Sequence, residues 1–194
     1  MNNTPHTNCL TLRLLHTAKG YKAVAFDIFD TLLKRDCARP ADLFALMEVT
    51  HQAALGFAEA RVAAEAETRQ TLGREVTLAE IYAHPALRGT DPAAECAAEL
   101  AMIAPNRPVA QAAAACHARG QKVYAVSDMY LPKEQIEAML QKCGLDFLDG
   151  VFVSCEYRVQ KRSGKLFKLF LQQTALRPDR KSTRLNSSHL SRSR

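Results

Sequence analysis

Residues 21–35 (YKAVAFDIFDTLLKR) constrain the fold of this chain more than any other stretch. The apolar residues 23–26 predict a buried strand that ends at Asp27, and Asp30 and Thr31 follow within one turn of chain. Open α/β sheets place their reactive groups at the carboxyl ends of central strands. Asp27 is therefore a candidate catalytic carboxylate, although Asp also commonly ends a strand or caps a turn.

Strand and helix signals alternate in the second half of the chain. Apolar residues at 122–126 predict a second strand, which ends at Ser127 and Asp128, and residues 150–154 predict a third. Helices are expected between and after these strands, at 107–119, 132–142 and 164–173. The alternation predicts right-handed βαβ units and therefore an α/β fold with a parallel, Rossmann-like sheet.

The segment 38–105 interrupts this alternation with helical patterns and no strand signal. A capping box at 77–80 begins one of its helices, and the apolar face of its first helix is expected to extend to Ala54 and Leu55. We expect an all-helical cap inserted after the first strand. The expected division is a leader with a short helix at 1–20, an α/β core at 21–37 and 106–178, the cap at 38–105 and a tail at 179–194.

The tail accounts for most of the basic character of the chain. Residues 179–194 carry four of the six net positive charges, and no basic stretch is interleaved with aromatic residues, so a nucleic-acid partner is not expected. The sequence DRKSTRLNSSH at 179–189 is similar to one reading frame of a sequencing-adapter oligonucleotide. We therefore expect a non-native tail on a fragment whose natural sequence continues beyond Pro178.

Composition favours a cytoplasmic protein. No run of about 18 apolar residues predicts a membrane span, and the N-terminus lacks the features of a signal peptide. The six cysteines form no C-x-x-C pair, and most lie in apolar surroundings, so buried, reduced thiols are expected. No membrane partner is expected, and the sequence leaves the oligomeric state open.

Three segments resemble motifs of the haloacid dehalogenase-like (HAD) hydrolase superfamily. They are FDIFDTLL at 26–33, VYAVSDMYLP at 123–132 and KRSGKLF at 161–167, and their order and spacing agree with that family over residues 21–173. The helical insertion after the first motif is similar to the helical cap of the family. The resemblance implies a Mg²⁺-dependent hydrolase that acts on a small phosphorylated metabolite through an aspartyl-phosphate.

The resemblance also implies a role for each matching position. Asp27 is the implied nucleophile, and Lys161 balances the negative charge, with Lys165 as the alternative lysine. A carboxylate nucleophile needs such a cation, together with donors that hold the transferred group. The implied substrate-binding residues are Thr31, Ser127 and Asp128.

Two departures from the phosphatase pattern concern proton transfer and metal binding. Phe29 stands where phosphatase members carry a second Asp as general acid, and Asp30 replaces that acid only if the backbone turns sharply after Asp27. Mg²⁺ would use the Asp27 carboxylate and the Phe29 backbone carbonyl. The acids of a fourth motif are expected beyond residue 178, so the chain as given is expected to be inactive.

Phe29 keeps two alternative functions open. Family members that cleave carbon–halogen bonds carry an aromatic residue at this position, since halide leaves without a proton, which favours a metal-independent dehalogenase-like hydrolase. The missing acid is also compatible with a non-catalytic HAD-fold module. Arg35 is expected to face solvent. The run 129–131 is expected to pack in the core, and a position of Tyr130 at the lining of the cleft is the alternative.

Overall fold

The apolar run before Asp27 forms strand β1 (Ala23–Phe26), which pairs in parallel with β4 (Lys122–Ser127). Strand β4 also pairs in parallel with β5 (Gly150–Val153), so the sheet order is β1-β4-β5. This computed structural model describes residues 8–176, and the expected tail at 179–194 lies outside them. The predicted α/β fold with a parallel sheet is confirmed. Within residues 8–176, however, β1 has one partner and lies at a sheet edge, not at its centre.

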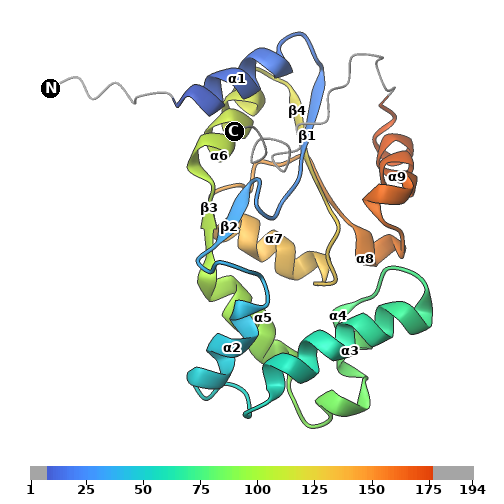
Figure 1. Cartoon of the computed structure of the whole chain (residues 1–194). Coiled ribbons are helices and arrows are strands. Elements are labelled where there is room, and N and C mark those ends of the chain that lie inside the picture. The colour runs from blue at the N-terminus through green and yellow to red at the C-terminus, as the bar shows by residue number, and fades with distance from the viewer. Residues whose placement is uncertain (1–7, 177–194) are drawn as a thin grey trace, which may run out of the picture.

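Helices cover both faces of this sheet (Figure 1). Because successive strand residues point to opposite faces, Val123 and Ala125 join the main core, whereas Tyr124 and Val126 join a second cluster. The second cluster is closed by α9 (Lys165–Thr174) through residues such as Phe170. The main core includes residues of α1 (Cys9–Ala18), α6 (Arg107–Ala118) and α7 (Lys133–Lys142), and it continues into the helices of the segment 38–105.

The helical cap lies at one end of the core (Figure 1). It consists of α2 (Asp42–Val49), α3 (Phe57–Leu72), α4 (Leu78–Tyr82), η1 (Pro85–Leu87) and α5 (Pro92–Met102). The capping box of Thr77 and Glu80 is formed. The expected extension of the first cap helix to Ala54 and Leu55 is wrong, because the chain leaves the helix at Thr50 and His51 takes a positive φ of 57°.

A two-stranded antiparallel ribbon connects the cap to the core. Strand β2 (Leu33–Arg35) carries the chain toward the cap, and β3 (Ile103–Pro105) brings it back. The prediction that residues 38–105 contain no strand is therefore wrong at 103–105. Proline disfavours helical geometry in the residue before it, and the β2 partner is distant in sequence, so local helical periodicity does not reveal this strand.

Two short helices follow β5 and lead to the third motif. Strand β5 ends at Val153, one residue earlier than expected, and α8 (Ser154–Tyr157) begins directly after it. The 3₁₀ turn η2 (Lys161–Ser163) then precedes α9. The third motif therefore begins in a tight turn beside the sheet.

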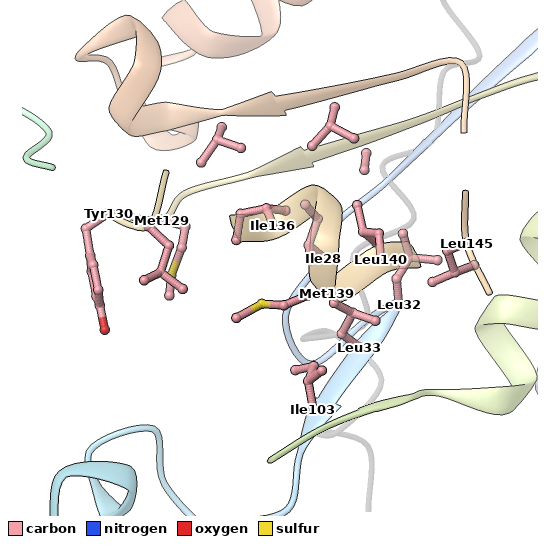
Figure 2. Packing of buried hydrophobic residues seen from close by; sticks show 14 of the residues in the cluster. Ile28, Leu32, Leu33, Ile103, Met129, Tyr130, Ile136, Met139, Leu140 and Leu145 are labelled. Carbon is pink, nitrogen blue, oxygen red and sulfur yellow. The ribbon is translucent and has the colours of Figure 1, made fainter. Parts of the chain in front are cut away.

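The first motif is held in place by buried apolar side chains. Ile28, Leu32 and Leu33 are fully buried, and Figure 2 shows them beside Met139 and Leu140 of α7. Close packing of this kind resists displacement of the backbone. The turn that carries the polar residues of the motif is therefore supported by the core beneath it.

The cap contains a fully buried ion pair that reaches the core. Arg61 of α3 binds Glu95 of α5 through Nε at 2.7 Å and Nη2 at 2.9 Å, and both side chains are 0% exposed. The guanidinium also lies 4.7 Å from the ring centroid of Tyr130, a core residue from the loop after β4. Tyr130 is buried, as expected of a packing residue.

We predict that Arg61→Met lowers the free energy of unfolding by about 3–5 kcal/mol, because it leaves the buried Glu95 carboxylate without its cation. Urea denaturation followed by circular dichroism measures this loss. The double variant Arg61→Met/Glu95→Leu should recover part of it, and the same change at the exposed Arg88 is the matched control. Equal losses at Arg61 and Arg88 would contradict the importance of the buried pair.

A second set of contacts joins α4 of the cap to the loops of the core. Glu80 binds Arg74 at 2.6 Å and also accepts a short hydrogen bond from Arg158 of the core. The Leu78 N–H donates to the Tyr130 carbonyl at 2.8 Å. Hydrogen bonds from Arg74, followed by those from Thr77 and Arg158, lower the pKa of Glu80 to about 2.

This shift predicts a pH-dependent contribution to stability. The folded-state pKa of Glu80 lies below the unfolded value of about 4.3, so its stabilisation is full above that value and is lost as the pH falls toward 2. The free energy of unfolding of Glu80→Gln should therefore fall less than that of wild type between about pH 6 and pH 3. Glu134→Gln, at an exposed position, serves as the control. Parallel pH profiles for wild type and Glu80→Gln would refute this prediction.

Two further expectations concern membranes and cysteines. Among residues 8–176, every helix is too short or too polar to cross a membrane. All six cysteines are free thiols, but only Cys116 and Cys155 are buried, so the expectation of mostly buried thiols is wrong. Burial raises the pKa of Cys155 to about 12.

Candidate active site

The chain turns sharply at the carboxyl end of β1, directly after Phe26. The carbonyl oxygens of Asp27 and Ile28 accept hydrogen bonds from Leu32 at 3.3 Å and Leu33 at 2.9 Å, respectively. Asp30 lies in the left-handed region with a φ of 57°. The turn fixes the Asp27 side chain, whose Oδ1 accepts the N–H of Ile28 at 2.8 Å. The sharp turn that Asp30 would need to replace the missing acid is therefore present.

Lys161 joins the ends of two neighbouring strands. Its Nζ lies 2.7 Å from Oδ1 of Asp27, at the end of β1, and donates to the Val126 carbonyl of β4 at 3.2 Å. Both side chains remain partly accessible, with 20% of Lys161 and 27% of Asp27 exposed. Since Lys161 and the Ile28 N–H both occupy Oδ1, Oδ2 is the carboxylate oxygen left to react.

The structure separates the two candidate lysines. Lys165 is an exposed residue at the start of α9, and its N–H donates to Ser163 Oγ at 3.3 Å. Among the described residues, only Lys161 forms an ion pair with Asp27. Lys161 is therefore the lysine that the geometry places at the site.

Strand β4 brings Ser127 and Asp128 to the same edge of the sheet. Ser127 is 2% exposed and is the last residue of β4, the strand that neighbours β1. The backbone N–H of Lys161 donates to Asp128 Oδ1 at 2.8 Å. The loop beyond is fixed by Ser154, whose Oγ accepts the Met129 N–H at 2.8 Å.

The Asp128 carboxyl differs from an ordinary surface acid. Asp128 is exposed as a residue, but nearby protein atoms displace water from its carboxyl group, which raises its pKa. The negative charges of Glu75 and Asp27 add to this rise, whereas Lys161 opposes it. A raised pKa favours a protonated form that can donate to a ligand.

Asn106 is a structural residue of the motif that sequence reasoning missed. Its Nδ2 donates to the Thr31 carbonyl at 2.7 Å, and its backbone N–H donates to the Leu32 carbonyl at 2.8 Å. Thr31 itself is buried within the turn. A polar residue directly before the helix at 107–118 is a weak local signal for this role, because its partners lie far away in sequence.

Phe29 is held by a cation from the connecting ribbon. The Arg35 guanidinium lies 4.2 Å from the Phe29 ring centroid, and it binds Glu99 of α5 through two hydrogen bonds of 2.8 and 2.9 Å. The expectation that Arg35 faces solvent is wrong, since its side chain is only 8% exposed. Burial opposes the charged form of Arg35, but its hydrogen bonds to Glu99 raise its pKa, and the charge of Asp30 adds a smaller contribution.

The described residues do not by themselves form a Mg²⁺ site. The Asp27 carboxylate and the Phe29 carbonyl are the two oxygens that the first motif offers, and Mg²⁺ requires near-octahedral oxygen coordination. Within residues 8–176, no group of three or more His, Cys, Asp or Glu side chains is placed to hold a metal ion.

Solved structures are similar in fold to this chain over most of its length. One dehalogenase has a TM-score of 0.54 at 16% identity, and the match covers 83% of this chain and 74% of that protein. The L-2-haloacid dehalogenase from Xanthobacter autotrophicus with chloropropionic acid covalently bound has a TM-score of 0.51 at 20% identity, covering 81% of this chain and 66% of that one. A HAD family enzyme from Bacteroides thetaiotaomicron has a TM-score of 0.53 at 14% identity, and the match covers 82% of this chain and 81% of that protein.

These similarities show that the chain has a HAD-like fold and confirm the resemblance at that level. Neither a protein-family model nor a curated protein sequence matches the chain. Because one fold supports different reactions, function has to be argued from the residues at the site.

Proposed function

We propose that this protein is a HAD-fold hydrolase that transfers the phosphoryl group of a small phosphorylated metabolite to Asp27 and then to water. The observation that carries this proposal is the 2.7 Å contact between Lys161 Nζ and Asp27 Oδ1 at the carboxyl edge of the sheet. A carboxylate held by a cation, with a second oxygen left to react, is suited to nucleophilic catalysis.

The residues around Asp27 support distinct parts of this reaction. Oδ2 attacks phosphorus, while Lys161 and the Ile28 N–H hold Oδ1 and keep the carboxylate in one orientation. The Ser127 hydroxyl binds an oxygen of the transferred group. Donors fixed before the reaction stabilise the charge that develops in the transition state.

Mg²⁺ dependence is part of the proposal on the grounds of charge. Lys161 supplies one positive charge, whereas Asp27 and a phosphomonoester together bring several negative charges to the same edge. A bound divalent cation would offset that excess. The Asp27 carboxylate and the Phe29 carbonyl are the two oxygens that the first motif would contribute.

A dehalogenase-like reaction is the second candidate, because Phe29 occupies the position of the usual second acid. The Arg35 guanidinium packs on the Phe29 ring, so the turn carries an apolar group at the position of that acid. Halide leaves without a proton, and two structurally similar proteins are described as dehalogenases. In this reaction Asp27 attacks carbon, not phosphorus.

Asp27→Asn is expected to abolish phosphate release from phosphomonoesters, with a loss of at least about 1,000-fold in kcat, because the amide is a poor nucleophile. The assay uses the complete protein with para-nitrophenyl phosphate and a panel of sugar phosphates, in the presence of Mg²⁺ or of a chelator. Mass spectrometry of acid-quenched wild type should detect a phosphoryl group on Asp27, and the chelator should stop turnover.

The same preparations separate the other readings. Chelator-insensitive halide release from chloropropionate, lost in Asp27→Asn, would establish the dehalogenase reaction in place of phosphoryl transfer. If wild type and Asp27→Asn give the same result with every substrate, a non-catalytic module is favoured.

Lys161→Met is expected to reduce Asp27-dependent turnover by at least about 100-fold, because it removes a charge aimed at the reacting carboxylate. Lys165→Met, a matched change at the exposed lysine, should leave kcat nearly unchanged. Greater loss in Lys165→Met than in Lys161→Met would assign the motif lysine to position 165.

A further inference from the structure

Phe29 leaves the first motif without an acid at the position that phosphatases use to protonate the leaving group. A leaving alkoxide is a strong base, so phosphoryl transfer from an alkyl or aryl ester needs a proton donor near its oxygen. Another carboxyl group near Asp27 is therefore required if the proposed function is correct. The described residues offer three acids in this region, namely Asp30, Glu75 and Asp128.

Two of these acids are placed less favourably. Asp30 belongs to the turn itself, three residues after Asp27, and takes a positive φ of 57°. Glu75 of the cap is only 2% exposed and forms a short ion pair with Arg69.

Asp128 is placed differently from both. It directly follows Ser127, the proposed ligand of the transferred group, at the end of the strand that neighbours β1. Lys161 contacts both acids, with its backbone N–H on Asp128 Oδ1 at 2.8 Å and its Nζ on Asp27 Oδ1 at 2.7 Å. One lysine therefore holds the two carboxyl groups at the same edge of the sheet, and the second oxygen of Asp128 remains able to carry a proton.

We propose that Asp128 is the proton-transfer residue of this site, which deepens the proposed function and rests on it. As Asp27 Oδ2 bonds to phosphorus and the phosphorus–oxygen ester bond breaks, the Asp128 carboxylic acid gives its proton to the leaving oxygen and releases a neutral alcohol. Water then attacks the aspartyl-phosphate. The Asp128 carboxylate takes a proton from that water, so phosphate leaves and both side chains return to their starting forms.

The charges that face Asp128 are consistent with both halves of this cycle. Partial desolvation and the carboxylates of Glu75 and Asp27 favour the protonated form, whereas Lys161 favours the ionised form. Their net effect is a raised pKa, which moves this acid toward the range in which it can both give and accept a proton.

The test compares two aryl phosphates of similar shape, phenyl phosphate and para-nitrophenyl phosphate, whose leaving groups differ in basicity. Asp128→Asn should lower kcat/KM for phenyl phosphate by about 100-fold and for para-nitrophenyl phosphate by only a few-fold. The amide oxygen of Asn can still accept the Lys161 N–H, so the loop is expected to keep its position. Glu156→Gln, an exposed acid on α8, should leave both substrates unchanged and is the control.

The pH profile gives a second readout that a merely structural role would not change. With phenyl phosphate, wild-type kcat/KM should fall at high pH as Asp128 loses its proton, and this dependence should be missing from Asp128→Asn. Equal losses on both substrates, or a leaving-group-dependent loss in Asp30→Asn instead, would overturn the assignment.

Failure of the proposal and failure of the proposed function give different results. Suppose that Asp27→Asn abolishes turnover of both esters, whereas Asp128→Asn lowers kcat/KM for the two esters by the same factor. The phosphohydrolase function is then retained, and Asp128 is rejected as its acid. Turnover that does not depend on Asp27, or no turnover by the complete protein with Mg²⁺, rejects both.

Discussion

The contact between Lys161 and Asp27 depends on the correct placement of three separate segments. Asp27 ends β1, Lys161 follows β5, and Lys161 also donates to the carbonyl of Val126 near the end of β4. The parallel register of the three strands brings these groups to one edge although they are far apart in sequence. A lysine that is partly buried against a carboxylate also needs that partner, since an unpaired charge at such a position is costly. The sheet and the site therefore support each other.

Much of this arrangement could be predicted from local sequence. Apolar runs that end in Asp27 and Ser127 identify the strands, and the spacing of glycine, proline and capping residues locates most helices. The resemblance to HAD motifs then nominates the site residues. Sequence alone could not decide between Lys161 and Lys165, because both lie in one short polar segment and only the path of the loop after β5 separates them.

Residues whose partners are distant were the ones that sequence reasoning missed. Arg35 and Arg61 look like surface residues by composition, yet they pair with Glu99 and Glu95 on α5. Strand β3 was hidden for the same reason, since its partner lies at the other end of the cap insertion. These contacts together tie the cap to the core through α5 and the ribbon. A helical pattern predicts that a helix exists, but it does not say which charged side chain the helix will bury.

The loop after β4 connects the chemistry at the sheet edge to the cap. It begins with Ser127 and Asp128, and two residues later Tyr130 packs against Arg61 and accepts the Leu78 N–H from α4. Ser154 fixes the same loop from the core side. A shift of the cap would therefore be transmitted to the backbone beside Asp128 within a few residues. The buried charges of the cap thus serve a purpose beyond holding its helices together, because they help to fix the position of the acid on which proton transfer is proposed to depend.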